Sequence, residues 1–445
     1  MRADWIGRIL RAIYTIVLYL LLPITVYHLV WRGFRHNAYF HRWAERYGLY
    51  PHAARTNGVL WIHAVSLGEV NAAAPLIDAL RKRRPDLRLL ITTITPTGSA
   101  RVRDLWGHQV EHVYLPYDLP GATRRFFAHY RPVLGLIMET EIWPNLLFTA
   151  REQNVPLHIL NARLSARSLR GYRVLAPLVS RALRTVRSVA AQSQEDAERF
   201  VRLGALPAQV NALGNLKFDV QAAAEGSLFR DAFRAHAGRR PVWIVASTHE
   251  EEEGPVFSMF RAVREQVPDL LMVWAPRHPE RFRPVSISAG NLGLRWSARS
   301  VATWPGPDDD LFLLDTLGEL AKFFAVADVA FIGGSLQPIG GHNLLEPAAA
   351  GVPIVTGPNL HNFADIAKRL REAGALIIAP NAEEVAAATI TLLRDPEQAA
   401  QMRAGGLELI ERGRGALQRY LQLVEADLPS PLKTQSGSAK RPPAA

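Results

Sequence analysis

The sequence predicts an α/β protein with two doubly wound domains that follow an apolar N-terminal helix. After Gly58, short apolar runs alternate with amphipathic segments, and this alternation occurs twice along the chain. The runs are apolar at consecutive positions, which is typical of strands buried on both faces of a parallel sheet. A long uncharged apolar segment lies within the first 46 residues.

The length of 445 residues predicts two or three domains at about 150 residues each. The strands expected in the first domain are 59–65, 87–93, 110–115, 133–138, 157–160, 189–192 and 210–213. Helical patterns separate them, for example 69–83. Such a sheet binds ligands at the carboxyl ends of its strands.

A second set of strands is expected at 242–246, 270–275, 292–296, 311–315, 329–332, 352–356 and 375–378. The join between the domains is expected around 218–241, where strand signals lapse and Ala, Gly and Arg dominate. The tail 430–445 is of low complexity and is expected to be disordered.

The N-terminal segment 12–30 is uncharged if His28 is neutral. Nineteen helical residues span about 28 Å, close to the hydrocarbon thickness of a bilayer. The sequence after it offers no small-residue cleavage site for a signal peptidase. No face is polar, which disfavours a buried core helix. The segment is therefore expected to be a membrane anchor, either spanning the bilayer or, with Pro23 permitting a kink, lying in one leaflet.

Basic residues gather at the two ends of the chain. Residues 1–46 contain seven arginines against Asp4 and Glu45, and the tail 430–445 adds three basic residues. Of the formal charge of +11, the body between them keeps about +3. A nucleic-acid-binding protein concentrates basic residues on its folded body, so this distribution favours an anionic membrane surface. The chain has no cysteine, which excludes disulfides and thiolate chemistry.

A glycine-rich block occupies residues 328–358. It combines a buried strand, a loop with four glycines, a helix opening near Asn343 and a second strand. Unpaired amides in such a loop, together with a helix N-terminus, attract an anion. Glu346 follows Asn343 by three residues, where a carboxylate can hold a ribose diol. The block therefore predicts a nucleotide site, and a loop that only permits close packing is the alternative.

Glu69 directly follows the first strand and its turn, at the start of a helix. A carboxylate at this position can act as a general base toward a hydroxyl, and the helix N-terminus favours its ionised form. Ser66 and Glu69 also have the spacing of a capping box, so a purely structural role stays open.

Polar side chains follow other strands. Arg277 comes after the strand 270–275, where a guanidinium suits a phosphate, although it can also be a solvated turn residue. Four glutamates after His249 are expected to form a solvated first helical turn. Glu139 and Glu141 follow the strand 133–138, where they are candidate acceptor contacts or surface residues.

Eight blocks together resemble one known family. They are HAVSLGEV (63–70), ITTITPTGS (91–99), YLPYDLP (114–120), METEIWPN (138–145), NARLSARS (161–168), STHEEEE (247–253), APRHPERF (275–282) and GGSLQPIGGHNLLEP (333–347). In this order they are similar to the 3-deoxy-D-manno-octulosonic acid (Kdo) transferases, which are membrane-associated glycosyltransferases of lipopolysaccharide assembly. The blocks cover nearly everything between the apolar segment and the tail.

The resemblance implies a GT-B fold, in which two Rossmann-like domains face a cleft. It implies a membrane anchor and basic segment at 1–46, an acceptor-binding domain at 47–225, a CMP-sugar-binding domain at 226–429 and a tail at 430–445. The implied reaction moves Kdo from CMP-Kdo to the 6′-hydroxyl of the tetraacyldisaccharide 1,4′-bisphosphate lipid A precursor (lipid IV-A), with inversion. No cofactor is implied, and the implied location is the cytoplasmic face of the inner membrane.

The resemblance also assigns residues. It makes Glu69 the catalytic base. It places donor contacts at Pro276, Arg277, His278, Leu317, Gly318, Glu319, Gly333, Gly334, Ser335, Asn343, Leu344, Leu345 and Glu346. Further candidates for acceptor or secondary contacts are Ser66, Gly68, Glu139, Lys217, Ser247 and Thr248. Since no HExxH motif occurs in the chain, we expect no metal site.

Two other functions share some of these features. A sugar-nucleotide epimerase of similar fold would use the same nucleotide site and release a free sugar, but it needs no lipid anchor. A non-enzymatic membrane scaffold would carry a degenerate nucleotide domain. The joint presence of Glu69, Arg277 and Glu346 favours the transferase.

Overall fold

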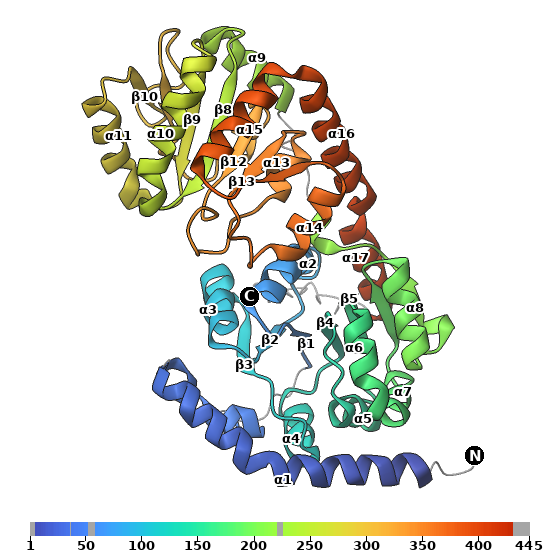
Figure 1. Cartoon of the computed structure of the whole chain (residues 1–445). Helices are drawn as coiled ribbons and strands as arrows, with labels where there is room; N and C mark the ends of the chain where they lie inside the picture. The colour runs from blue at the N-terminus through green and yellow to red at the C-terminus, as the bar shows by residue number, and fades with distance from the viewer. Residues whose placement is uncertain (1–4, 36, 52–57, 220–225, 430–445) are drawn as a thin grey trace, which may run out of the picture. The chain divides into compact units, whose positions relative to one another are not determined.

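The computed structural model describes residues 5–35, 37–51, 58–219 and 226–429. The chain forms two compact units, the first from residues 1–216 with 415–445 and the second from residues 217–414. Each unit is built on one seven-stranded sheet in which all paired strands run parallel. These are the Rossmann-like, doubly wound sheets that the sequence predicts (Figure 1).

The first sheet has the strand order β3-β2-β1-β4-β5-β6-β7. Its strands are β1 (Leu60–His63), β2 (Leu89–Thr93), β3 (Glu111–Tyr114), β4 (Leu134–Met138), β5 (Leu157–Ala162), β6 (Ser188–Ala191) and β7 (Val210–Ala212). The helices of this unit are α1 (Trp5–Arg35), α2 (Leu67–Arg83), α3 (Pro96–Trp106), α4 (Pro120–Tyr130), α5 (Pro144–Glu152), α6 (Ala166–Gly171), α7 (Ala176–Leu183), α8 (Gln194–Leu203) and α17 (Ala416–Asp427). The strand order reverses between β1 and β4, which is where doubly wound sheets bind ligands.

The second sheet has the order β10-β11-β9-β8-β12-β13-β14, and it reverses between β8 and β12. Its strands are β8 (Val242–Thr248), β9 (Leu271–Pro276), β10 (Trp296–Ala298), β11 (Leu311–Leu313), β12 (Val329–Ile332), β13 (Ile354–Thr356) and β14 (Leu376–Ile378). Its helices are α9 (Gly226–Ala237), α10 (Glu250–Gln266), α11 (Phe282–Asn291), α12 (Leu320–Phe324), α13 (Leu345–Ala349), α14 (Ala364–Glu372), α15 (Ala382–Arg394) and α16 (Pro396–Gly413).

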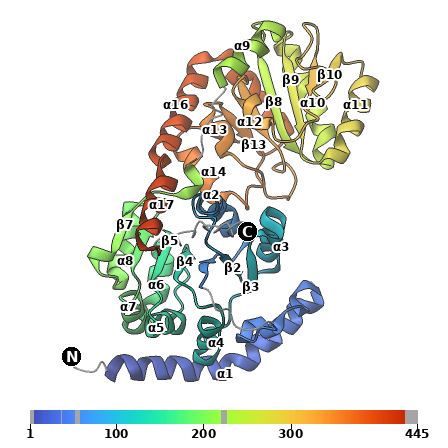
Figure 2. The ribbon, with the colours of Figure 1, turned by 180° about the vertical axis from the view of Figure 1, so that it is seen from behind.

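Both faces of each sheet are buried under helices. In β1, Leu60 and Ile62 join a core with α2, α3 and α17, whereas Trp61 joins a core with α4, α5, α7 and α8. In β8, Ile244 packs with α9, α12 and α13, while Val245 packs with α10 and α15. Opposite views show the helices on the two faces (Figures 1 and 2). This two-sided burial explains why the strand sequences are apolar at consecutive positions.

All fourteen expected strands are present, with differences at their ends. The largest difference is at β10, which was expected at 292–296 and runs from Trp296 to Ala298. Leu292 instead caps the end of α11, and the backbone N–H of Leu294 donates to the carbonyl of Ala289. The apolar residues 292–294 therefore complete a helix terminus rather than a strand.

The division of the chain differs from the expected domain boundaries. The first unit ends at Leu216, and α9 lies within the region where the join was expected. Helix α17 was expected with the second domain but belongs to the first, where Tyr420, Leu421 and Val424 enter the core beside α2. The chain thus returns to the first unit at Gly415. The tail 430–445 lies outside the described residues.

Two of the N-terminal arginines are built into the first unit rather than exposed for a membrane surface. The Arg46 side chain is buried, donates to the carbonyl of Ile94 at 2.9 Å and stacks on Tyr114. Arg42 pairs with Glu45 at 2.7 Å and donates to the carbonyl of His112. The expectation that these two arginines contact lipid headgroups is therefore wrong, because their guanidinium groups are already hydrogen bonded within the fold.

The return of the chain is fixed by the buried hydroxyl of Tyr420. It accepts a hydrogen bond from the backbone N–H of Asn161 at 3.2 Å and lies 3.0 Å from the carbonyl of Gly214, to which it donates. Asn161 in turn accepts from the N–H of Leu216 through its side-chain oxygen. One hydroxyl on α17 thus connects β5 to the segment that leaves the first unit.

We expect Tyr420→Phe to lower the free energy of unfolding by about 2 kcal/mol, because it leaves the buried N–H of Asn161 and the half-buried carbonyl of Gly214 without their partner. Urea unfolding followed by tryptophan fluorescence measures this. Tyr39→Phe is the matched control, since no hydrogen bond to the Tyr39 hydroxyl occurs among the described residues. Equal stability of the two variants would contradict the assigned role.

Candidate active site

The candidate residues of both units lie where strands end. Because all paired strands are parallel, the carboxyl ends of the strands in each sheet lie along one edge. Glu69 and Glu139 follow β1 and β4, the two strands at the reversal of the first sheet. Ser247 to His249 and Gly333 to Ser335 follow β8 and β12, at the reversal of the second. Each unit therefore presents its candidates at its own switch point.

Glu69 lies in the first turn of α2 and folds back on the end of β1. Its carboxylate accepts from the backbone N–H of Val65 at 2.8 Å and from the Ser66 hydroxyl at 3.1 Å. Ser66 caps the helix by accepting from the N–H of Glu69. The Ser66–Glu69 spacing thus makes a variant of the capping box, in which the carboxylate accepts from the backbone N–H of Val65 instead of the backbone N–H of Ser66.

The ionisation of Glu69 differs from the expected one. Burial raises the pKa of this carboxyl to about 8, although the N–H of Val65 acts in the opposite direction. The nearby carboxylates of Glu139 and Glu141 raise it further. The expected preference for the ionised form is therefore wrong, because burial outweighs the helix N-terminus. A carboxyl with a pKa near the working pH has the basicity that a general base needs.

The two other carboxylates come from the loop after β4. Glu139 has a φ of 58°, a left-handed conformation that is costly for a non-glycine residue and that clusters at active sites and ligand-binding segments. Glu141 accepts from the Trp143 indole N–H at 2.7 Å, and burial raises the pKa of its carboxyl. The first unit therefore brings three carboxyl groups into electrostatic contact at its switch point.

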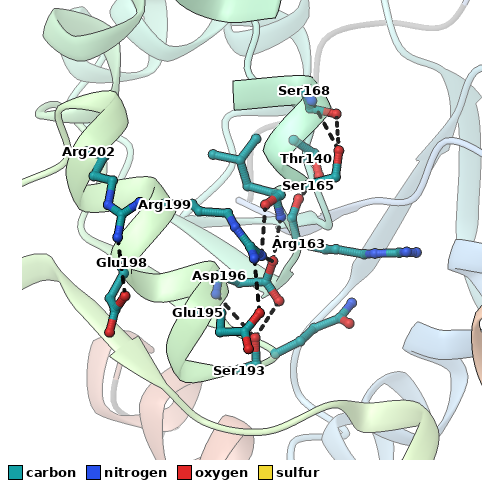
Figure 3. Close-up of polar contacts among 12 residues, drawn as sticks. Thr140, Arg163, Ser165, Ser168, Ser193, Glu195, Asp196, Glu198, Arg199 and Arg202 are labelled. Carbon is teal, nitrogen blue, oxygen red and sulfur yellow. Dashed lines mark hydrogen bonds and ion pairs between the residues drawn. The ribbon is translucent and has the colours of Figure 1, made fainter. Parts of the chain in front are cut away.

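The loop after β5 is held by the N-terminus of α8 (Figure 3). The buried Asp196 carboxylate accepts from the N–H of Leu164 at 2.9 Å and from the hydroxyl of Ser193, which caps α8. The hydroxyl of Thr140 donates to the carbonyl of Arg163, so the loops after β4 and β5 are connected. The Arg163 side chain extends away from this cluster (Figure 3). These bonds fix the backbone directly beside Glu139.

In the second unit, the glycine loop encloses a carboxylate of the protein itself. Glu252 of α10 is fully buried and accepts from the backbone N–H groups of Gly334, Ser335 and Leu336 at 2.7 to 3.0 Å. It accepts a fourth hydrogen bond from the N–H of His249. Four amides thus converge on one side chain, which compensates the burial of its charge.

Gly333 and Gly334 allow the loop to lie against Glu252 because they have no side chain. A Cβ at Gly333 would lie 2.9 Å from the Glu252 carboxylate and 2.7 Å from the Cα of Thr248. Gly334 has a φ of 64°, and a Cβ there would lie 2.8 Å from the His342 ring. Only glycine therefore lets the loop approach β8 and α10 this closely.

The expected anion site in the glycine loop is consequently wrong in its details. The amides of Gly334 and Ser335 already donate to Glu252, so they are not available to a phosphate. The Ser335 hydroxyl is likewise engaged, because it donates to the carbonyl of Ile332 and accepts from the N–H of Gly357. The loop therefore contributes to the site by positioning its neighbours, while its own amides bind Glu252.

The helix expected near Asn343 begins at Leu345 and has only five residues, so its dipole is weak. The Asn343 side chain accepts from the N–H of Leu345 and donates to the Glu346 carboxylate at 2.8 Å. Leu344 and Leu345 are buried in the core and can offer a ligand only backbone groups. Asn343 and Glu346 are the half-buried polar pair of this segment.

Arg277 joins a cluster of three histidines. Its side chain is exposed at the end of β9, next to His278, and its backbone N–H donates to the carbonyl of Thr248. His249 lies 2.9 Å from His342 between their Nε2 atoms, with the ring planes nearly parallel. The His278 ring packs edge-on against His249 at 5.1 Å between centroids. We define Arg277, His249, His278 and His342 as the basic cluster.

The remaining donor candidates follow β11. Leu317 and Gly318 are exposed in this loop. Glu319 is paired with Arg299, whose guanidinium makes two hydrogen bonds to it and lowers the pKa of the carboxyl. This loop belongs to the same sheet edge as Arg277, because β11 lies next to β9.

The other candidates divide into structural and surface positions. Pro276 is buried as the last residue of β9, and the buried Thr248 hydroxyl accepts from the Trp274 indole. Ser247 has a strained φ of 60°. Gly68 is exposed in the first turn of α2, and Lys217 begins the second unit.

The role of Glu252 was not predicted from the sequence. The glutamates 250–253 were expected to be solvated, which is wrong for Glu252 and for Glu253, which pairs with Arg281. The helical period contained the signal, since Glu252 lies on the same face of α10 as Val256, Met259 and Val263.

We expect Glu252→Ala to destabilise the second unit by about 3 kcal/mol or more, because it leaves several buried amides without an acceptor. Glu252→Gln should cost less, since its amide oxygen still accepts. Thermal unfolding measures both, with Glu251→Ala, an exposed neighbour, as the control. A Glu252→Ala protein as stable as the control would show that the amides have other partners.

Comparison with known proteins agrees with this architecture. A family model described as 3-deoxy-D-manno-octulosonic-acid transferase matches residues 41–220, and one described as glycosyl transferases group 1 matches residues 306–408. The chain is 37% identical over 419 residues to the 3-deoxy-D-manno-octulosonic acid transferase of Haemophilus influenzae, covering 93% of this chain and 98% of that protein. It is 41% identical over 375 residues to the enzyme of the same name from Bordetella pertussis, covering 82% and 86%.

The fold is also that of a solved structure. The MurG structure of Acinetobacter baumannii is 13% identical, with a TM-score of 0.51, and the match covers 83% of this chain and all of that one. At this identity the likeness shows the fold alone, which is GT-B with two Rossmann-like domains. The sequence identity to curated relatives extends over nearly their full length. The chain therefore belongs to the Kdo transferase family of glycosyltransferases.

Proposed function

We propose that this glycosyltransferase moves Kdo from CMP-Kdo to the 6′-hydroxyl of the tetraacyldisaccharide 1,4′-bisphosphate lipid A precursor, lipid IV-A. The proposed transfer inverts the anomeric carbon and uses neither metal nor cofactor. The observation that carries the proposal is Glu69, a half-buried carboxyl at the switch point of the first sheet with a pKa near 8. Family membership supports the choice of sugar, and the names of the relatives support it equally.

The acceptor hydroxyl is a poor nucleophile, so it needs a base as the new bond forms. In the proposed step the hydroxyl oxygen bonds to the anomeric carbon of Kdo, and its proton passes to the Glu69 carboxylate. The bond from the anomeric carbon to the phosphate oxygen breaks, and its electron pair leaves with CMP. The N–H of Val65 and the hydroxyl of Ser66 orient the carboxylate for this role.

The leaving CMP gains negative charge on its phosphate. Arg277 is an exposed guanidinium at the edge of the second sheet, and a guanidinium can bind phosphate oxygens in pairs. We assign it the stabilisation of the leaving group, which needs cationic groups rather than a particular metal. Asn343 and Glu346 present a polar pair suited to the ribose hydroxyls.

We expect Glu69→Gln to lower Kdo transfer by about 100- to 10,000-fold while CMP binding is kept, because the amide cannot accept the proton. In the wild type, kcat/KM should rise with pH up to about 8 and level off above it, since only the ionised form acts as the base. Mass spectrometry of the lipid product measures transfer, and also counts the Kdo residues added.

Glu198→Gln, at an exposed position on α8, is the matched control and should transfer normally. Full activity of Glu69→Gln would reduce Glu69 to a helix-capping residue. Release of free Kdo from CMP-Kdo without any lipid product would favour a hydrolase or epimerase instead.

Helix α1 is the part of the chain that indicates a membrane location. By length and composition it can cross a membrane. One stripe of it nevertheless contacts the first unit: Arg11 pairs with Glu152, Tyr14 donates to Asp118 at 2.9 Å, and Thr15 hydrogen bonds to Asn145. Farther along, Leu29 and Gly33 are buried. In Figures 1 and 2, α1 runs alongside α4 and α5.

The opposite stripe of α1 is apolar and exposed. Its members are Ile6, Ile9, Ile13, Ile16, Val17, Leu20, Ile24, Tyr27, Trp31 and Phe34. The bonds of Arg11, Tyr14 and Thr15 hold this part of α1 alongside the folded unit, which favours a helix that lies in the plane of the membrane. We therefore propose that α1 lies in one leaflet of the inner membrane, on its cytoplasmic face, with the exposed stripe in the lipid. Arg8, Arg32 and Arg35 are exposed for anionic headgroups.

We expect both ends of α1 to lie on the same side of the membrane. The chain has no native cysteine, so Trp5→Cys and Arg35→Cys each give a single thiol. A membrane-impermeant maleimide should label both in inverted inner-membrane vesicles and neither in intact spheroplasts. Labelling of the two positions from opposite sides would establish a spanning helix. The cysteine-free parent is the control.

A further inference from the structure

We propose that the imidazoles of His249 and His342 bind an anionic group of the donor together with Arg277 and His278, and that this binding takes up a proton. The inference rests on the proposed function, because it specifies how the second unit receives the donor. The anionic group is the phosphate next to the cytidine or the carboxylate of the sugar, and the test below separates them.

The position of the pair follows from three segments. His249 follows β8, Arg277 and His278 follow β9, and His342 lies in the loop that leads from β12 to α13. The two Nε2 atoms are 2.9 Å apart and the rings are nearly parallel, at 7°. In such a contact one Nε2 donates and the other accepts. Two neutral imidazoles satisfy this contact when one Nε2 carries the hydrogen and the other does not.

The charges around the pair keep it neutral. Burial, followed by His249, Arg277 and His278, lowers the pKa of His342 to about 4. Burial and His278 also lower the pKa of His249, against the opposing pull of Glu252 and Glu251 from α10. The Glu252 carboxylate is occupied by four backbone amides, so it accepts no hydrogen bond from the imidazoles.

A site of this kind favours an anion over a cation. Glycine loops that follow a strand usually offer their amides to phosphate, but here Glu252 takes the amides of Gly334 and Ser335. His342 lies directly over Gly334. An anion at this loop therefore meets the imidazoles and Arg277 instead of the amides. Among the described residues, no group of three or more His, Asp or Glu side chains is arranged to hold a metal.

Proton uptake follows from the electrostatics. An anion at the basic cluster favours the charged form of each imidazole and raises its pKa. Protonation of the accepting Nε2 breaks the contact between the rings, because two N–H donors then face each other, and each ring can donate to the ligand. Binding should therefore take up protons near neutral pH, and affinity for the anion should fall as the pH rises.

The experiment is isothermal titration calorimetry of the full-length protein in detergent, with CMP at pH 6.5 in two buffers of different ionisation enthalpy. The variants are His249→Gln and His342→Gln, which keep a polar group near Nε2 but cannot be protonated. The control is His236→Gln, an exposed histidine on α9. Thermal unfolding of each variant verifies its fold.

We expect the wild type to take up more protons than either variant, by up to one per CMP, and the variants to bind CMP roughly ten-fold more weakly. Cytidine should give no uptake. If free Kdo rather than CMP produces the difference, the carboxylate is the group that the pair binds. Equal uptake and equal affinity in wild type and both variants, for CMP and for Kdo, would overturn the proposal.

The wild-type pH dependence gives a second test that needs no variant. CMP affinity that is constant or rises between pH 6 and 8 would also count against the pair. Kdo transfer is assayed on the same preparations. A wild type that takes up protons on binding CMP but transfers no Kdo would refute the proposed function and leave this site standing. Normal Kdo transfer together with unchanged CMP binding in the variants would support the proposed function and refute this site.

Discussion

The parallel direction of every paired strand is the constraint on which the two sites depend. In a parallel sheet each connection crosses a face, so all the loops that follow strands gather at one edge. The strand order reverses at β1/β4 in one unit and at β8/β12 in the other. At these points the loops diverge and leave room for a ligand. Glu69, Glu139, His249 and the glycine loop owe their positions to this topology.

The two edges carry opposite electrostatic conditions. Burial and neighbouring carboxylates raise the pKa of Glu69, whereas burial and neighbouring cations lower the pKa of His342. Each group is therefore biased toward its neutral form. At the first edge the carboxyl holds a proton because its neighbours are carboxylates, whereas at the second edge the imidazole lacks one because its neighbours are cations.

Much of the fold was predictable, because both faces of each sheet are buried and the strands therefore read as continuous apolar runs. Leu292 and Leu294 form an apolar run that completes the end of α11, so the predicted strand was placed a few residues before the observed β10. The charged residues were harder. Arg46 and Glu252 occur in charge-rich stretches that resemble solvated surface, and only tertiary contacts show them buried. Pairing between distant segments, such as Glu252 with Gly334, leaves no local signal in one sequence.

Glu252 shows why the site need not follow the usual glycine-loop chemistry. A carboxylate fixed in the loop satisfies the amides permanently, so the loop keeps its shape whether or not a nucleotide is present. The same carboxylate removes the backbone dipoles as a binding force for phosphate. Ligand binding then relies on side chains, and imidazoles differ from amides because their charge depends on pH. Because Glu252 occupies the amides, the anion is bound by imidazoles, and the strength of this binding depends on pH as well as on the ligand.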